Sequence, residues 1–229
     1  MKLISTLLLF LLFSLVVPVQ RNAVAQESDV GAWFAFAGQG SLGEPDTRWR
    51  WWLDAHARFF EESDGFETSI LRPGAGYRVT DQVTTWLGYA WIYNDTRNGS
   101  FDEHRIWQQL IWSDSYAWGT PFLRSRLEQR FEERGSEVGW RLRQFVRWTR
   151  PIEAESRFNF RAWDEVFIDL NDTAWGQNFG FSQNRAFLGL GWNLDDTGRH
   201  TLEFGYLNQY IQRGRARDSM NHILGVTLI

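Results

Sequence analysis

From residue 49 onward, apolar and polar positions alternate along the chain in segments of about twelve residues, with turns between them. In residues 49–60, one face of the alternation carries Trp49, Trp51, Leu53, Ala55, Ala57 and Phe59. The other face carries Arg50, Trp52, Asp54, His56, Arg58 and Phe60. Successive side chains of a strand point to opposite faces, so this pattern predicts a strand with one apolar face and one polar, charged face.

The same pattern predicts ten strands, at 49–60, 66–79, 83–94, 102–113, 121–132, 138–149, 155–168, 182–194, 200–212 and 219–229. Strands of soluble proteins usually have about 5–6 residues, whereas membrane-spanning strands need about 9–11 at a tilt of about 45°. The predicted fold class is therefore all-β: a single transmembrane antiparallel up-and-down β-barrel of about ten strands, with twelve as the alternative. A further apolar segment, 30–38, is the candidate for an eleventh strand.

The connectors predict which end of the barrel faces which side of the membrane. Outer-membrane barrels place short turns in the periplasm and longer loops outside. This rule puts 80–82 and 195–198 in the periplasm, and the longer connectors 95–101, 169–181 and 213–219 outside.

With both termini periplasmic, the strand number is even, which leaves 30–38 at the lumen or the periplasmic rim. An open sheet edge in lipid leaves backbone groups unpaired, so we expect the last strand to close the barrel by pairing with 49–60.

The apolar face also shows a depth profile. Trp140 and Trp148 lie eight residues apart on that face, about 26 Å along a strand. They bracket Leu142 and Val146, as two aromatic girdles bracket the apolar band of a membrane barrel, while Gln144 between them departs from the pattern. The alternative is a soluble calycin-like barrel with inward-pointing aromatic residues.

The first residues predict export. Lys2 precedes an apolar run from Leu3 to Val17, and the small residues at 23–25 suit signal-peptide cleavage. The predicted divisions are a signal peptide (1–25), an N-terminal segment (26–48) and the barrel (49–229). The predicted location is the bacterial outer membrane, with its lipid and the barrel-assembly machinery as partners.

Charge and cysteine content narrow the function classes. Lys2 and Arg21 leave with the signal peptide, so 22 basic residues face 28 acidic ones and the mature charge is −6. A chain of this sign is not a general nucleic-acid binder. The chain has no cysteine, so an exported form must be stabilised without disulfides.

Several short motifs occur in a set order: GYRVTDQ at 76–82, WLGY at 86–89, EHRIWQQ at 103–109, RSRLEQRF at 124–131, RLR at 141–143, EVF at 165–167, QNR at 183–185 and EFGYL at 203–207. This order resembles a family of secreted Gram-negative proteins catalogued only as a domain of unknown function. The resemblance covers about 49–229. It implies an outer-membrane barrel and implies no activity.

The charged residues of successive strands share one face, which is the predicted lumen. The predicted lumen-lining residues are Asp54, His56, Arg58, Glu103, Arg105, Gln109, Arg124, Arg126, Glu128, Arg130, Arg141, Arg143, Arg147, Glu165, Arg185 and Glu203, to which Arg72, Arg78, Arg157 and Arg161 add. One interpretation is a salt-bridge network that fills a narrow barrel, in which each buried charge has a partner. The other is an anion-preferring channel or a binder of small acidic solutes, because arginines outnumber carboxylates on this face.

An outer-membrane hydrolase is a third possibility, and a structural or adhesive barrel that uses its outer loops is a fourth. Asp54 could orient His56 as a general base, because the two share a strand face. The chain lacks a Gly-x-Ser-x-Gly elbow and a His-x-x-x-His metal pair. We therefore predict no catalytic residue, no metal and no cofactor.

Overall fold

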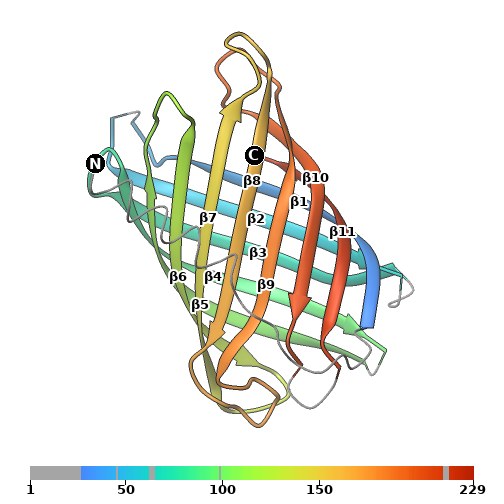
Figure 1. Ribbon diagram of the computed structural model, residues 1–229. Coiled ribbons are helices and arrows are strands. Elements are labelled where there is room, and N and C mark those ends of the chain that lie inside the picture. Colours follow the sequence, from blue (N-terminus) through green and yellow to red (C-terminus); the bar gives the residue numbers. More distant parts are fainter. Residues whose placement is uncertain (1–26, 45, 62–64, 98, 214–216) are drawn as a thin grey trace.

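The computed structural model describes residues 27–44, 46–61, 65–97, 99–213 and 217–229. Within these residues the chain forms eleven strands that close into one barrel (Figure 1), which confirms the predicted all-β barrel. Among the same residues, no helix is long and apolar enough to cross a membrane. The predicted signal peptide lies outside the described residues.

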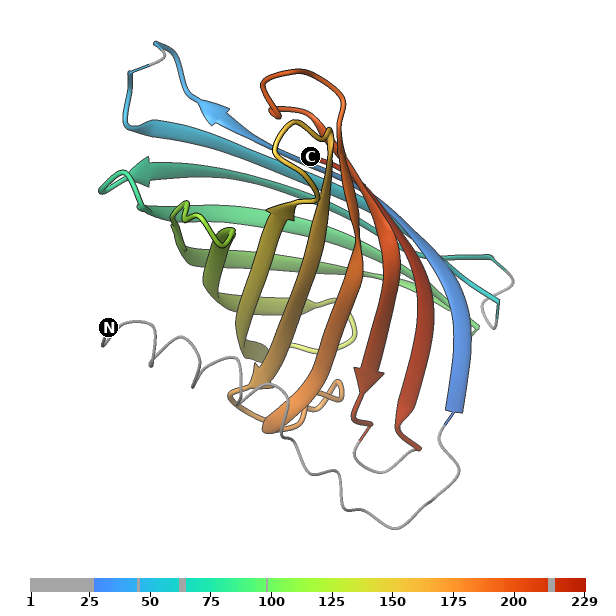
Figure 2. The same ribbon diagram turned by 45° about the horizontal axis from the view of Figure 1, so that its top comes forward.

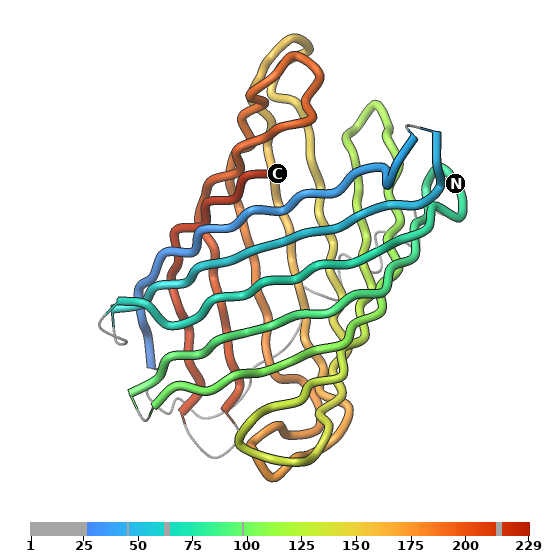
Figure 3. The backbone as a smooth tube through the Cα atoms, turned by 180° about the vertical axis from the view of Figure 1, so that it is seen from behind, coloured from blue at the N-terminus to red at the C-terminus, as the bar shows by residue number. Residues whose placement is uncertain are grey.

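The strands, in chain order, are β1 (Glu27–Ser41), β2 (Trp49–Phe60), β3 (Gly65–Arg78), β4 (Val83–Thr96), β5 (Gly99–Ser113), β6 (Thr120–Glu132), β7 (Val138–Pro151), β8 (Phe158–Asp169), β9 (Gly180–Asn193), β10 (Thr201–Ile211) and β11 (Ser219–Leu228). Consecutive strands pair antiparallel all round the barrel. The ring closes where β1 pairs parallel with β11, from Glu27↔Ser219 to Phe36↔Leu228 (Figure 3).

The strand register gives the barrel its tilt. A row of paired residues that starts at Ser41 in β1 passes through Arg126 in β6 and returns to β1 at Glu27, fourteen residues earlier. For eleven strands this stagger corresponds to a strand tilt of about 40° and a narrow barrel. Figure 2 shows the tilted strands wrapped around one lumen.

The strand number and the closure correct two predictions. The count of ten was wrong, because segment 30–38 is the middle of β1 and a full member of the ring. The expected pairing of the last strand with 49–60 was also wrong, because β1 lies between β11 and β2. An odd number of alternating strands makes the first and last strands run in the same direction. Their pairing is therefore parallel, and the chain enters and leaves the barrel at opposite ends, which also overturns the expectation that both termini share one side.

The connectors correct a third prediction. Residues 95–101 do not form a long loop, because β4 continues to Thr96 and β5 begins at Gly99. Gly99 has φ +114°, a conformation that side chains disfavour, and it allows this tight reversal. Connectors of similar length therefore occur at both ends of the barrel, and loop length does not identify the outer end.

Small residues make room for large ones inside the barrel. A Cβ at Gly74 would lie 2.5 Å from the Trp107 ring, and one at Gly88 would lie 2.1 Å from it. Trp107 is fully buried and packs in a cluster with Trp86 and Ile92. The glycines of β3 and β4 thus let this tryptophan lie flat on the inner wall.

The parallel closure can be tested by crosslinking. The Ala32→Cys/Leu224→Cys pair joins directly paired residues of β1 and β11, about 4.8 Å apart, and should form a disulfide in the assembled protein. The Ala57→Cys/Leu224→Cys pair should stay reduced, because β1 separates β2 from β11. Non-reducing gels report both results, and the reverse pattern would restore a ring closed by β2.

Candidate functional site in the lumen

The register places the sixteen predicted lumen residues on the inner face of the barrel, where they are buried or line a cavity. Of the four additional arginines, Arg72 and Arg161 are buried there too. Arg78 is the last residue of β3, and Arg157 lies exposed before β8 in an ion pair with Asp196.

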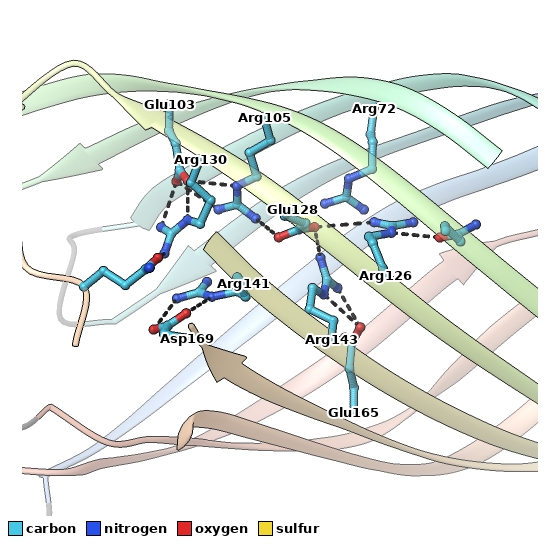
Figure 4. Close-up of polar contacts among 12 residues, drawn as sticks. Arg72, Glu103, Arg105, Arg126, Glu128, Arg130, Arg141, Arg143, Glu165 and Asp169 are labelled. Atoms are coloured by element: carbon cyan, nitrogen blue, oxygen red, sulfur yellow. Dashed lines mark hydrogen bonds and ion pairs between the residues drawn. The ribbon is translucent and has the colours of Figure 1, made fainter. Parts of the chain in front are cut away.

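Glu128 is the centre of the charged network. Its carboxylate is fully buried and accepts hydrogen bonds from Arg143 at 2.8 Å and Arg105 at 3.1 Å (Figure 4). Arg126 lies 3.8 Å from the same carboxylate. Three positive charges surround this buried carboxylate and offset the cost of burying its charge.

A second carboxylate extends the network along the inner wall of the barrel to neighbouring strands. Glu165 in β8 accepts hydrogen bonds from Arg124 at 2.5 Å and from Arg143 at 2.7 and 3.0 Å. Arg185 in β9 lies 3.9 Å from it. Glu165 therefore joins β6, β7, β8 and β9 from inside the lumen.

The network continues toward the end where β8 joins β9. Glu103 binds Arg105 and Arg130 through paired hydrogen bonds. Arg130 also donates a 3.1 Å hydrogen bond to Gln177, which is buried although it lies in the β8–β9 connector, 170–179. This connector, the longest predicted loop, therefore folds inward and closes part of that end.

Asp54 and His56 lie close together on β2, but Arg72 makes the shorter contacts with the Asp54 carboxylate. Asp54 accepts bonds from Arg72 at 3.0 and 3.1 Å and from the Trp52 indole at 2.9 Å. His56 is 3.4 Å from the same carboxylate, and the adjoining cavity has Thr227 as its one hydroxyl residue among the described residues. These contacts describe a structural ion pair. Within the described chain, no group of three or more His, Cys, Asp or Glu is placed to hold a metal ion.

Aromatic side chains support the arginines, a feature that the charge pattern did not reveal. Arg58 stacks on Trp33 at 4.1 Å and Arg147 on Phe122 at 4.7 Å, measured from guanidinium carbon to ring centroid. Arg126 lies 4.7 Å from the Trp107 centroid. Such cation–π contacts stabilise a guanidinium without using its hydrogen-bond donors.

A cavity of about 190 Å³ lies beside the network. On the β1 and β11 side its lining includes the small residues Ala35, Ala37 and Gly225, together with Trp33 and Gln39. Facing them are six arginines and three carboxylates: Arg58, Arg72, Arg124, Arg143, Arg147, Arg185, Asp54, Glu165 and Glu203. The charged lining of this cavity thus carries a surplus of three positive charges.

Two of these arginines make no direct contact with any described carboxylate, although Glu67 attracts Arg58 and Glu203 attracts Arg147 at longer range. Among the described residues, Arg58 and Arg147 make no hydrogen bond or ion pair to an acidic side chain. Across the described chain, eleven of the twelve buried side-chain atoms without a partner are N–H donors, and the exception is Asp102 Oδ1. The unpaired polar groups of the interior are therefore mostly donors, which a hydrogen-bond acceptor could satisfy.

A second cavity, of about 370 Å³, opens at the end covered by the β8–β9 connector. Four arginines and two carboxylates line it: Arg130, Arg134, Arg141, Arg213, Glu132 and Asp169. Trp175 of the connector stacks on Arg130 at 5.0 Å. The positive surplus thus recurs at this end of the lumen.

One known protein is similar to this chain in sequence, and one solved structure is similar to it in fold. An uncharacterised protein of Methylorubrum extorquens is 30% identical over 226 residues, which cover 97% of this chain and 96% of the relative. A solved structure of the NanC porin aligns with a TM-score of 0.49 at 14% identity, covering 82% of this chain and 90% of that one.

A family model also matches residues 30–221, and so includes most of β1. The predicted resemblance to a family without an assigned activity is thereby confirmed. The chain belongs to the family described as "Protein of unknown function (DUF2490)".

Proposed function

We propose that the protein is an outer-membrane barrel whose lumen forms a narrow, anion-preferring conduit or binding barrel for small acidic solutes. One observation carries the proposal. The lumen cavity has six arginines and three carboxylates, and two of those arginines, Arg58 and Arg147, make no hydrogen bond or ion pair to an acidic side chain among the described residues.

The outer surface supports the membrane location. Large apolar side chains point away from the lumen and are well exposed, as at Leu87 (59%), Leu188 (66%) and Leu224 (55%). On β7, Trp140 and Trp148 flank Leu142, Gln144 and Val146, which is the spacing expected of two aromatic girdles. A soluble barrel would expose this surface to water, which is unfavourable for patches of this extent.

The lumen charges favour anions for two reasons. A positive surplus in a confined, poorly screened space attracts anions and repels cations. The guanidinium groups of Arg58 and Arg147 are held by aromatic stacking, so their donors remain available to a carboxylate or phosphate. The small volume of the cavity, about 190 Å³, favours a small solute.

A structural barrel is the second candidate, and the ion-pair network favours it. Glu103, Arg105, Glu128, Arg143 and Glu165 form an unbroken chain of hydrogen bonds from β5 to β8. Such a chain fills part of the lumen and ties four strands together. If this network blocks the lumen completely, small anions can bind in the cavity but cannot pass through the barrel.

Location and facing can be tested together. The protein should fractionate with outer membranes and show heat-modifiable migration on gels. Leu142→Arg, on the outer face near mid-depth, should cost about 2–4 kcal/mol and lower the amount of assembled barrel. Leu142→Phe is the matched control and should assemble normally. Recovery of the wild type as a soluble periplasmic protein would contradict the membrane location.

Ion selectivity tests the lumen. Purified protein in planar bilayers should give small, anion-selective conductance steps. Arg58→Gln and Arg147→Gln should each lower the anion-to-cation permeability ratio about fourfold, since a unit charge about 10 Å from an ion in water is worth about 0.4 kcal/mol, with opposite sign for an anion and a cation.

Arg199→Gln, in the exposed β9–β10 turn, is the control and should leave the ratio unchanged. Cation selectivity, or equal effects of all three substitutions, would refute the anion path. A correctly assembled barrel that shows no conductance would favour the structural candidate.

A further inference from the structure

Four adjacent strands carry polar side chains on their outer faces. These residues are Gln108 in β5, Ser125 in β6, Gln144 in β7 and Asp164 in β8, and we call them the polar arc. Each alternates with an inward neighbour of the network, as Gln144 does with Arg143 and Ser125 with Arg126. They therefore point away from the lumen.

The polar arc lies at mid-depth of the outer surface. Gln144 is four residues from both Trp140 and Trp148, and Ser125 pairs directly with it. Gln108 pairs with Leu127, which is two residues from Ser125 in β6. Asp164 pairs with Val146, which is two residues from Gln144 in β7. Because the tilt offsets these shifts, the four residues lie within about 3 Å of one depth.

Neighbouring strands satisfy the arc only in part. Gln108 and Gln129 exchange two 3.0 Å hydrogen bonds, and Ser125 donates to Gln144 at 2.7 Å. The Gln144 side chain is exposed, and its amide nitrogen has no partner among the described residues.

Among the residues that the structure describes, Asp164 accepts hydrogen bonds from one nitrogen, that of Asn184, at 3.0 and 3.1 Å. A carboxylate offers about four lone-pair sites and an amide two donors and two lone pairs, so the arc has donors and acceptors to spare.

On the opposite side of the barrel, the outer polar groups are those of Tyr206 and Asn208 in β10 and His222 in β11, which form one hydrogen-bonded cluster. There the outer face carries Phe34, Leu188 and Leu224, all well exposed. Polar groups that face lipid at mid-depth are unfavourable, and they normally mark contacts with another protein surface. The arc differs from that cluster, because it spans four strands and includes a carboxylate.

We propose that the polar arc is a subunit interface within the membrane and that its occupant is a second copy of this chain. This inference rests on the proposed membrane location and not on the anion path. A two-fold interface requires a surface that complements itself. Glutamine amides meet this requirement, because each carries both a donor and an acceptor.

The chemistry of the arc favours a copy over an unrelated cationic partner. Asp164 is its only charge, and the amides of Gln108 and Gln144 on the facing copy are neutral donors of suitable type. Leu123, Leu142 and Val146 surround the amides and supply apolar packing. The same four strands thus provide all the groups that a pair of copies needs.

The mass of the purified protein in mild detergent tests the interface. The wild type should be a stable oligomer by native mass spectrometry. The triple variant Gln108→Leu/Ser125→Ala/Gln144→Leu should be monomeric yet retain heat-modifiable migration, because these substitutions suit a lipid-facing surface. Asn208→Leu, on the outer face of β10, is the matched control and should remain oligomeric. A monomeric wild type, or an oligomeric triple variant, would overturn the proposal.

Crosslinking in native membranes identifies the occupant. The chain has no cysteine, so Gln144→Cys introduces a single reporter. It should form a disulfide-linked dimer, whereas Leu188→Cys, exposed on β9, should not. Attachment of a different protein at position 144 would refute the second copy. Loss of membrane fractionation would instead refute the location on which the interface depends.

Discussion

Hydrogen bonding around a closed ring of strands is the constraint on which the other features of this protein depend. Every strand has two paired edges, so the register of one pair sets that of the next until the stagger of fourteen residues returns to β1. This stagger fixes which side chains face inward and at what depth. The parallel pairing of β1 with β11 completes the ring, and it brings the small residues of β1 opposite the arginines of β6 and β7.

The ring determines the electrostatics of the lumen. Confinement forces arginines from β2 to β9 into one narrow space, where each needs a carboxylate, an aromatic face or a ligand. Glu128 and Glu165 form ion pairs with Arg105, Arg124 and Arg143. Arg58 and Arg147 rest on aromatic rings instead, and this is where the positive surplus is found.

Outside the strands, local polar contacts shape the connectors. In the β9–β10 turn, Asp195 accepts hydrogen bonds from Thr197 and from the His200 backbone, which hold its carboxyl pKa below the usual value. Gly198, with φ +65°, completes that turn. The β8–β9 connector is different, since Gln177 reaches the lumen and hydrogen-bonds Arg130. One turn only reverses the chain, and the other narrows an opening.

The alternation of residue types predicted the fold class, the ten strands from β2 onward and the facing of the charged residues. It could not predict the ring closure, because β1 is rich in glycine and alanine on both faces and has no charged face to mark it. The pattern did not predict that Trp33 and Phe122 stack on arginines, because it carries no information about contacts between different strands. Gln177 escaped for the same reason, because a loop residue has no periodicity.

Gln144 is a polar exception on the outer face of β7. Its relation to other polar residues becomes apparent only when the neighbouring strands are placed beside it. In β6 and β7 both faces carry polar residues, so hydrophobic alternation specifies their register weakly. The ion pairs from Arg143 to Glu128 and Glu165 fix this register from inside the lumen. The outer face is then free to depart from the apolar pattern where another surface covers it. Inner charge and outer amides are in this sense linked: the network that holds β6 and β7 in register allows the polar arc to exist.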